Sequence, residues 1–438
     1  MKFTFKGGIH PYEGKELTMD KDVVEYMPKG DMVYPLSQHI GAPATALVKK
    51  GDRVLVGQLI AEASGFVSAN IHSSVSGTVK AVEARLLASG SKVNSIIVEN
   101  DGLFESVEFI PNNKPIEELT KDEILEAIKA AGIVGMGGAG FPTHVKLSPK
   151  EPDKIDTIIV NASECEPYLT SDYRRIMDEA DKVIEGLRLV LSLFKGAKGI
   201  IAVEDNKPKA IKLLREKLNG ATDIVVNSMK TKYPEGAERQ LIYANTGRLI
   251  NSKMLPADAG CIVHNVDTVY AIFEAVREGR PLIDRLMTIT GDAIENPCNI
   301  NVRMGTNYAE LIDVAGGFKN EPEKIVAGGP MMGKAIYTLD MPATKSSSAI
   351  LCMTKDEVAE YEPSNCIRCG RCVEVCPGRV MPSTLMDLIE HNDIDGFLKY
   401  NGMECCECGC CSYICPAKRH LTQAIAGTRK QVLASRKK

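Results

Sequence analysis

The chain has 438 residues, close to three times the roughly 150 residues of a typical domain, so several domains with ample hydrophobic core are expected. Its 53 Lys and Arg residues are balanced by 57 Asp and Glu residues, which argues against binding of nucleic acid through bulk positive charge. No apolar run is long enough to span a bilayer, and the opening MKFTFKGGIHP has no apolar core of a secretory signal. We therefore expect a reducing, cytosolic environment, with any membrane association peripheral.

The N-terminal region has a β-rich pattern. Short alternating apolar runs over residues 48–98 are separated by Gly and Ser turns. The phrase GDRVLVGQ, followed by SGTV, resembles the two halves of a biotinyl/lipoyl-type barrel, but no lysine between Arg53 and Lys80 could carry a prosthetic group. We predict an N-terminal arm and a barrel-sandwich domain over residues 1–112, with a structural or docking role.

The pattern changes to alternating helices and strands after this region. Thr120 and Glu123 form a capping box for a helix that ends at Gly132. Buried strands are then predicted near 156–161, 199–204 and 223–228, between helices near 173–194, 208–218 and 235–246. This alternation predicts a multidomain α/β protein in which residues 113–255 form a parallel sheet with helices on both faces.

A smaller unit is predicted next. A helical pattern over 266–278 is followed by short strands near 286–290, 299–303 and 324–328 around a helix near 307–314. This order indicates a β-grasp-like α+β region over residues 256–345, which ends before a linker at Ser346–Ser348.

The cysteines predict two iron–sulfur clusters. Ten of the fourteen lie between Cys366 and Cys415, and the spacing C-x2-C-x2-C-x3-C-P occurs twice. In such runs the fourth cysteine ligates the cluster of the other run. The predicted ligands of the first [4Fe-4S] cluster are Cys366, Cys369, Cys372 and Cys415, and those of the second are Cys405, Cys408, Cys411 and Cys376. A pair of zinc sites is the alternative, although zinc usually takes its ligands as two separated pairs.

The remaining cysteines fall outside this spacing. Cys406 and Cys410 are interpreted as bystanders, and Cys261, Cys298 and Cys352 as small core residues. Residues 346–438 are therefore predicted to form a helical, ferredoxin-like domain with two clusters. Its end, residues 418–438, carries seven Lys and Arg residues and no acid. Both a solvated tail and a docking segment for an acidic partner or an anionic membrane fit this composition.

A glycine-rich segment indicates a phosphate site. Gly135-Met136-Gly137-Gly138-Ala139-Gly140 fits G-x-G-x-x-G, but it follows a helix rather than the strand that a Rossmann fingerprint requires. Its backbone can still approach a phosphate closely, with Lys146 as the nearby cation. The strand ending at Asn161 leads into Glu164 and Glu166, at the edge where parallel sheets bind ligands. An exposed acidic loop is the alternative interpretation.

These motifs together resemble a known family. The segment GIVGMGGAGFPT resembles the FMN loop of the NADH-oxidising subunit of respiratory complex I, and NASECEP resembles its following acidic loop. Gly236-Ala237-Glu238 and HNVDT (264–268) match two further motifs in order. With the FKGGIHP opening, the barrel-like region and the two cysteine runs, nearly the whole chain is similar to the RnfC subunit of the Rnf electron-transport complex.

The resemblance implies roles for individual residues. The FMN contacts would come from Gly135, Gly137, Gly138, Gly140, Lys146, Asn161, Glu164 and Asn265. The nicotinamide side would be lined by Glu166, Phe141 and Glu238, and Lys253 would meet the nucleotide phosphates. Ser163, Ala237 and His264 depart from the complex I pattern. Cys165, beside the flavin site, is interpreted as a small packing residue, with a redox role as the alternative.

The function that this resemblance implies is an NAD(H)-dependent oxidoreductase subunit. It would exchange hydride between NAD(H) and non-covalent FMN and pass single electrons through the two clusters, and no side chain would act as a catalytic acid or base. Its partners would be other Rnf subunits, including membrane subunits and a ferredoxin-like iron–sulfur subunit, which couple electron transfer to Na+ or H+ movement on the cytoplasmic side of the membrane. The alternatives are a cobalamin reductase of microcompartments and a non-catalytic electron-relay and assembly subunit.

Overall fold

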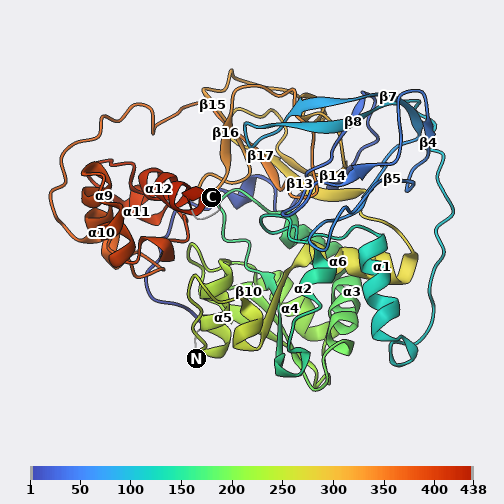
Figure 1. Ribbon diagram of the computed structural model, residues 1–438, viewed down its shortest axis with the longest axis horizontal. Helices are drawn as coiled ribbons and strands as arrows, with labels where there is room; N and C mark the ends of the chain where they lie inside the picture. The colour runs from blue at the N-terminus through green and yellow to red at the C-terminus, as the bar shows by residue number, and fades with distance from the viewer. Residues whose placement is uncertain (1–2, 436–438) are drawn as a thin grey trace.

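A computed structural model describes residues 3–435 as four modules (Figure 1). The central module is a parallel sheet in the order β11-β10-β9-β12. Its strands are β9 (Thr157–Ala162), β10 (Lys198–Glu204), β11 (Ile224–Met229) and β12 (Cys261–Asn265). They confirm the three predicted strands and add β12.

Helices cover both faces of this sheet, as predicted. One face packs against α3 (Ser171–Ser192), α4 (Pro208–Lys217) and α6 (Val266–Phe273), which continues as one π-helical turn, η5 (Glu274–Glu278). The other face packs against α5 (Glu238–Thr246). Neighbouring residues along a strand point to opposite faces, so Ile158 lies in the core with α3 whereas Ile159 lies in the core with α5.

The segment that enters this module is also helical. Helix α1 (Lys121–Ala130) begins with the predicted capping box, in which Glu123 N donates to Thr120 Oγ1 and Thr120 N donates to Glu123 Oε2. Gly132, at φ +66°, follows the end of the helix in the left-handed region that favours glycine. The short helix α2 (Thr143–Lys146) follows the glycine loop.

The barrel-sandwich module has two sheets. One sheet contains β2 (Met32–Pro35), β8 (Lys92–Asn100), β7 (Gly77–Leu86) and β4 (Arg53–Val54). The other contains β3 (Thr45–Ala46), β5 (Leu59–Glu62) and β6 (Ile71–His72). Val54, Ile60, Val79 and Ile96 are buried in the core of this module. The predicted β-rich fold is thereby confirmed.

A six-stranded mixed sheet forms the third module, in the order β1-β14-β13-β17-β15-β16. Its elements are β1 (Val23–Glu25), β13 (Asp284–Thr290), β14 (Cys298–Arg303), β15 (Lys324–Ala327), β16 (Lys334–Ile336), β17 (Ala349–Met353) and helix α7 (Tyr308–Val314).

Two strands of this sheet cross the predicted domain boundaries. β1 comes from the N-terminal arm and pairs with β14. β17 lies beyond the predicted end of the module at residue 345, yet it pairs with both β13 and β15. The Ser346–Ser348 segment therefore leads into a central strand rather than into the next domain, and a correct boundary falls after Met353.

The fourth module is helical. It contains α8 (Arg371–Glu374), α9 (Pro382–Glu390), α10 (Ile394–Lys399), α11 (Cys410–Ile414) and α12 (Leu421–Ser435). The expectation of a solvated tail is wrong for residues 421–435, because Leu421, Ile425 and Val432 of α12 are buried. Residues 436–438, the end of the predicted basic segment, lie outside the described part of the chain.

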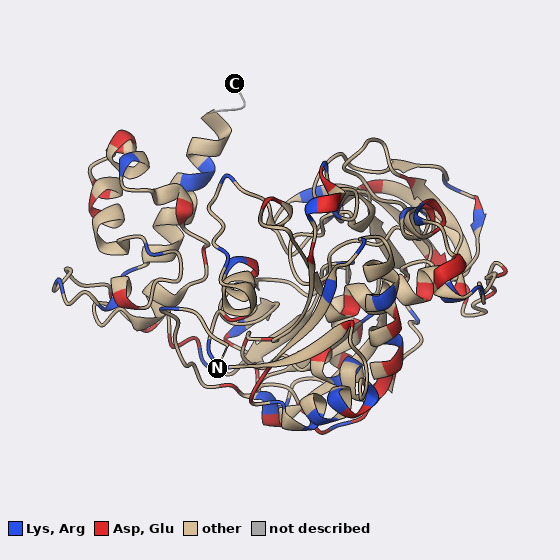
Figure 2. Cartoon of the chain, turned by 90° about the horizontal axis from the view of Figure 1, so that it is seen from below, with Lys and Arg blue, Asp and Glu red and all other residues tan. Residues whose placement is uncertain are grey.

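Short 3-10 turns complete the described secondary structure. They are η1 (Lys15–Leu17), η2 (Ile116–Glu118), η3 (Pro152–Lys154), η4 (Pro256–Ala259) and η6 (Gly402–Glu404). No helix within residues 3–435 is both long and apolar enough to cross a membrane. Acidic and basic residues are interspersed over the helices of the central module (Figure 2), which agrees with the balanced composition.

Candidate functional site

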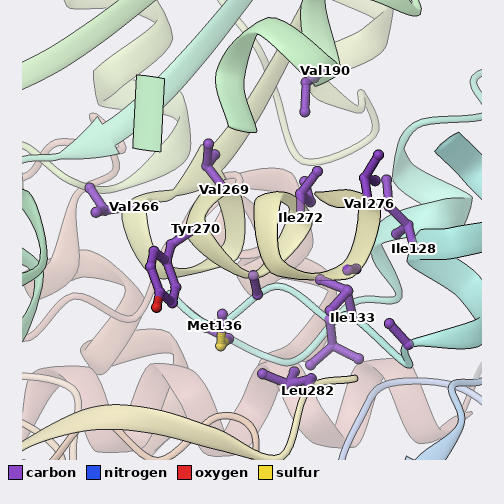
Figure 3. Packing of buried hydrophobic residues seen from close by; sticks show 14 of the residues in the cluster. Ile128, Ile133, Met136, Val190, Val266, Val269, Tyr270, Ile272, Val276 and Leu282 are labelled. Carbon is purple, nitrogen blue, oxygen red and sulfur yellow. The ribbon is translucent and has the colours of Figure 1, made fainter. Parts of the chain in front are cut away.

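The glycine loop is held as a closed turn between α1 and α2. Gly135 N donates to Phe141 O at 2.9 Å, and Thr143 N donates to Ile133 O at 3.0 Å. The buried side chains of Ile133 and Met136 belong to the same hydrophobic core as residues of α6 (Figure 3), and this packing holds the loop against that helix. Met136 N also donates to Thr268 Oγ1 at 3.0 Å. The crest of the loop, residues 137–139, is exposed.

Two of the glycines are required by close approach. A Cβ at Gly137 would lie 2.8 Å from Asn265 Cβ. At Gly140, with φ +70°, a Cβ would lie 2.9 Å from Gln38 O of the barrel-sandwich module. Gly138 has open space around it. The loop is thus fitted against β12 on one side and the barrel-sandwich module on the other.

Asn161 and Asn265 lie at the carboxyl ends of neighbouring strands, β9 and β12. Asn161 Nδ2 donates to Gly236 O at 2.8 Å, which joins the strand end to the loop before α5. Asn265 caps α6 by accepting from Asp267 N at 2.9 Å, and its Nδ2 donates to Asp172 Oδ2 at 2.7 Å. The sheet therefore brings three distant segments to one edge, as the order of the motifs predicts.

Lys146 and Glu238 meet at the same edge. Lys146 Nζ lies 3.0 Å from Glu238 Oε1 and 2.6 Å from the carbonyl oxygen of Val263. Within the chain, the predicted phosphate cation is therefore paired with a residue predicted to line the nicotinamide side. Lys253 is placed differently, because it is exposed on the loop after α5.

The acidic loop after β9 is a strained and heavily bonded segment. Glu164 has φ +48°, and its Oε1 accepts from Asp172 N at 2.7 Å. Desolvation raises the pKa of Glu164, while the charges of Lys15 and Lys207 lower it. Glu166 points toward the turn between β15 and β16, where its oxygens accept from Met331 N and Met332 N at 3.1 and 2.8 Å. Desolvation raises the pKa of Glu166 to about 7 against these two bonds.

Cys165 lies between Glu164 and Glu166 in the sequence and is partly buried. Its Sγ accepts from Gly236 N at 3.3 Å, and desolvation raises the pKa of its thiol. A thiol whose pKa is raised favours the packing interpretation over a reactive one. Cys261, Cys298 and Cys352 are buried, and this confirms the prediction that they are core residues.

The residues that sequence reasoning missed come from outside the motifs. Lys15 of the N-terminal arm is buried, and its Nζ donates to the carbonyl oxygens of Glu164, Glu166 and Leu169 at 2.9, 3.0 and 2.6 Å. The pKa of Lys15 is lowered, mainly because burial desolvates its ammonium group. Lys15 lies 149 to 154 positions from its partners, so no local pattern could reveal it.

Unpaired polar atoms test whether this region fits a flavin. Within the described residues, four buried polar atoms at the site have no hydrogen-bond partner in the chain: Thr143 Oγ1, Ser163 Oγ, Glu164 Oε2 and His264 Nε2. Buried polar atoms are normally hydrogen-bonded. Four unpaired atoms in these segments therefore indicate a site at which a polar ligand supplies the missing hydrogen bonds. Together with the glycine cradle, the residues fit FMN.

The cysteine runs come together within the helical module. One small cavity is lined by six cysteines: the four predicted ligands Cys376, Cys405, Cys408 and Cys411, together with Cys406 and Cys410. Leu421 packs together with Cys372, Cys411 and Cys415, and Arg419 lies beside Cys366. Cys366 and Cys369 are exposed.

This arrangement is compatible with four-iron clusters. Within residues 3–435, no three His, Cys, Asp or Glu side chains are arranged around the position of a single metal ion. A [4Fe-4S] cluster takes its ligands at separate irons, so they need not share one metal position. The residues around the cavity therefore fit a cluster.

Family models match each module. Residues 3–103 match the RnfC barrel sandwich hybrid domain, and residues 128–274 match the Nuo51 FMN-binding domain. Residues 286–335 match the SLBB domain, and residues 358–381 match a 4Fe-4S binding domain. The protein is thus a flavin and iron–sulfur oxidoreductase subunit, and both predicted cofactor types are confirmed.

Curated relatives identify the family. The RnfC subunit of the proton-translocating ferredoxin:NAD(+) oxidoreductase complex of Clostridium ljungdahlii is 48% identical over 383 residues, which cover 87% of this chain and 83% of the relative. The RnfC subunit of the Na(+)-translocating ferredoxin:NAD(+) oxidoreductase complex of Acetobacterium woodii is 47% identical over 439 residues, which cover 99% and 98%. The chain belongs to the RnfC family, as the motifs predicted.

Solved structures show the same fold at low sequence identity. An NAD+-reducing [NiFe]-hydrogenase in the H2-reduced state aligns with a TM-score of 0.50 at 17% identity, covering 73% of this chain and 62% of that chain. The air-oxidised state aligns with the same TM-score at 18% identity, covering 74% and 68%. The relatives favour an Rnf subunit over the cobalamin reductase and relay alternatives.

Proposed function

We propose that the edge of the central sheet is the FMN and NAD(H) site of this subunit. The observation that supports this most strongly is the convergence of the glycine loop, Asn265 and Glu164, because Gly137 contacts Asn265 and Asp172 is hydrogen-bonded to both Asn265 and Glu164. The same segments contain four buried polar atoms without partners in the described chain. The glycine loop would hold the flavin phosphate with Lys146, while Asn161, Glu164 and Asn265 would hold the ring.

The nicotinamide would lie on the open side of this site. Phe141 is partly exposed beside the crest of the glycine loop, and Glu238 extends from the first turn of α5. Glu166 would join this side only after exchanging its bonds to Met331 N and Met332 N. Lys253, on its exposed loop, would reach the nucleotide phosphates from outside.

FMN supplies the conversion between the two-electron hydride of NAD(H) and the single electrons carried by clusters. The chain's own contribution is to orient the two rings side by side and to keep the site dry. The burial of Lys15 and of Ser163, with residues 164–166 of the acidic loop partly buried, supports this.

The two clusters would be ligated across the runs. The cavity that Cys376 shares with cysteines of the second run supports this pairing. Cys415 packs near Cys372 of the first run and also near Cys411 of its own run. Cys406 and Cys410 are left as neighbours of the cluster. Cys366 and Cys369, being exposed, would place the first cluster where a partner's iron–sulfur centre can approach.

The partners would be other Rnf subunits: membrane subunits that translocate the ion and a ferredoxin-like iron–sulfur subunit. The names of the relatives, which describe ion-translocating ferredoxin:NAD(+) oxidoreductase complexes, support this. The subunit would lie on the cytoplasmic side of the membrane, where NAD(H) and ferredoxin are available.

Anaerobic addition of NADH to the purified, flavin-loaded chain tests the proposal. We expect the flavin absorbance to bleach before that of the clusters. Gly137→Ala should weaken flavin retention because its Cβ would strike Asn265, whereas Gly427→Ala, in open space on α12, should not. A flavin that NADH leaves oxidised would support the electron-relay alternative.

A further inference from the structure

The first described residues form a segment that contacts two modules at once; we name residues 3–9 the N-terminal strap. Phe3 pairs with Met229 at the end of the edge strand β11, and Lys230 N donates to Phe3 O at 3.0 Å. Ile9 and Tyr233 then exchange two backbone hydrogen bonds of 2.9 Å each. One side of the strap is therefore fixed to the central sheet and to the loop before α5.

The other side of the strap contacts the iron–sulfur module. Gly8 N donates to Val375 O at 2.8 Å, directly before the proposed ligand Cys376. A Cβ at Gly7 would lie 2.9 Å from Val375 O and 3.1 Å from the carbonyl carbon and oxygen of Cys376. Gly7 and Gly8 have φ values of +86° and +85°. Glycine is thus needed at Gly7 both for the backbone conformation and for the closeness of the two backbones.

Tyr233 extends this contact to a second proposed ligand. Its Oη donates to Cys408 O at 2.7 Å in a buried hydrogen bond. A small hydrophobic core at this contact contains Ile9, Tyr233, Cys408 and Cys410. Cys165 of the acidic loop packs against this core. Cys165 lies between Glu164 and Glu166 of the proposed flavin site. The side of the iron–sulfur module that carries the proposed ligands Cys376 and Cys408 therefore faces the proposed flavin site. The strap lies where the two modules meet.

The covalent connection between the modules does not fix this arrangement alone. Residues 355–365, between β17 and the first cysteine run, contain neither helix nor strand and are mostly exposed. Near the strap, the remaining polar contacts between the two modules include Arg239 with Glu404 and Gln240 with Pro377 O. In Figure 1 the dark blue strap runs between the helices of the iron–sulfur module and the central sheet.

We propose that the N-terminal strap is a positioning element for electron transfer, which holds the Cys376-containing cluster at a fixed distance from the flavin. The proposal rests on the proposed function of the flavin site. In the step concerned, the reduced flavin loses one electron and the oxidised cluster gains it, with no bond made or broken. Because electron tunnelling falls steeply with distance, a small displacement of the iron–sulfur module slows this step without affecting hydride transfer.

The test compares Gly7→Ala with Gly90→Ala in the full chain loaded with FMN and clusters. Gly90 lies in the turn between β7 and β8 at φ +80°, and nothing lies within 4 Å of an added Cβ. Gly90→Ala therefore introduces the same backbone strain as Gly7→Ala but no contact with another module. In stopped-flow experiments with NADH, we expect both variants to reduce the flavin at the wild-type rate. Cluster reduction should slow severalfold in Gly7→Ala alone, because the added Cβ would push the backbone of Val375 and Cys376 away from the strap.

Hydrogen–deuterium exchange provides a readout independent of activity. The amides of residues 371–378 should exchange faster in Gly7→Ala than in Gly90→Ala, because the docked segment loosens. Equal cluster reduction in the two variants, or equal exchange of this segment, would overturn the proposal. If NADH does not reduce the wild-type flavin, the proposed function fails, and the exchange result alone then decides whether the strap fixes the iron–sulfur module.

A second variant applies if Gly7→Ala loses its iron. Lys232 donates to Phe5 O, and its Nζ lies 4.0 Å from the centre of the Phe5 ring, so Lys232→Met loosens the strap without crowding a cluster ligand. We expect full iron content, unchanged EPR spectra after chemical reduction, and slower flavin-to-cluster transfer. Transfer at the wild-type rate in this variant would overturn the proposal.

Discussion

Lys146 is the residue on which flavin retention should depend most directly. Replacing it with Ala would remove the proposed charge-assisted contact to the flavin phosphate, worth about 1.5–3 kcal/mol. It also leaves Glu238 without the ion pair of 3.0 Å. We expect flavin to be lost on gel filtration while the iron–sulfur absorbance stays, measured as flavin and iron per chain. Lys150→Ala, on an exposed neighbour, is the control, and full flavin content in Lys146→Ala would contradict the assignment.

Asp172 should make stability depend on pH. Desolvation and the charges of Glu164 and Asp267 raise its pKa from 3.8 to about 8. When a group has a higher pKa in the folded than in the unfolded protein, its protonation stabilises the folded state. This stabilisation is complete below the unfolded-state pKa and is lost as the pH rises to the folded-state pKa. Asp172→Asn stays neutral, so the Tm of this variant minus that of the wild type should increase between about pH 6 and about pH 8.

Differential scanning fluorimetry over this pH range measures the effect. Asp122→Asn, at an exposed position in the first turn of α1, is the control and should show a constant difference in Tm. A pH-independent difference for Asp172→Asn would mean that Asp172 is ionised in the folded protein throughout.

The elements of the central module could be predicted because their signals are local. Strands of a parallel sheet are buried on both faces and read as continuous apolar runs, and β9, β10 and β11 lie where such runs occur. Membership of a sheet is not a local property. From the sequence, β1 and β17 are assigned to the N-terminal and iron–sulfur domains. Strands of only three and five residues carry no signal for the distant strand with which they pair.

The same distinction applies to the site. The position of Asn161, Glu164 and Asn265 at one edge of the sheet could be predicted, because each lies at or just after the end of a strand within a recognisable motif. Lys15 could not, since its contacts are to carbonyl oxygens in a distant loop. The bonds of Glu166 to the β15–β16 turn could not be predicted either, because they depend on how two modules pack.

The crossed cysteine runs lead to a prediction for the iron–sulfur module. Cys376 lines the same cavity as Cys405, so Cys376→Ser and Cys405→Ser should alter one and the same EPR signal. Cys415→Ser should instead group with Cys366→Ser, in keeping with the proximity of Cys415 to Cys372. Redox titration of each variant assigns the signals when the cluster potentials differ.

Cys352→Ser, in a buried strand of the six-stranded sheet, is the control and should leave both signals unchanged. If Cys376→Ser groups with Cys366→Ser, each run ligates its own cluster and the crossed pairing is wrong. In all ligand variants NADH should still reduce the flavin, because hydride transfer requires only the central module.

At the scale of the whole molecule, the modules are arranged around the central sheet. The barrel-sandwich module contacts the glycine loop through Gln38, the six-stranded sheet contacts the acidic loop through Met331, and the iron–sulfur module contacts the loop before α5 through Cys408. Three modules thus meet around the proposed flavin site, although its proposed cofactor contacts all belong to the central module.

The last prediction concerns attachment to the membrane. Because the relatives are named as subunits of ion-translocating complexes, we expect the full chain to sediment with membranes only when its partner subunits are present. Such a contact between protein surfaces includes exposed charge pairs, which are screened over about 8 Å at physiological ionic strength and about 3 Å at 1 M salt. We therefore expect high salt to release the chain from partner-containing membranes, as measured by immunoblotting of pellet and supernatant. Membranes without the partner subunits are the control. Recovery of the chain from those control membranes only with detergent would show that it binds lipid by itself, contrary to attachment through partners.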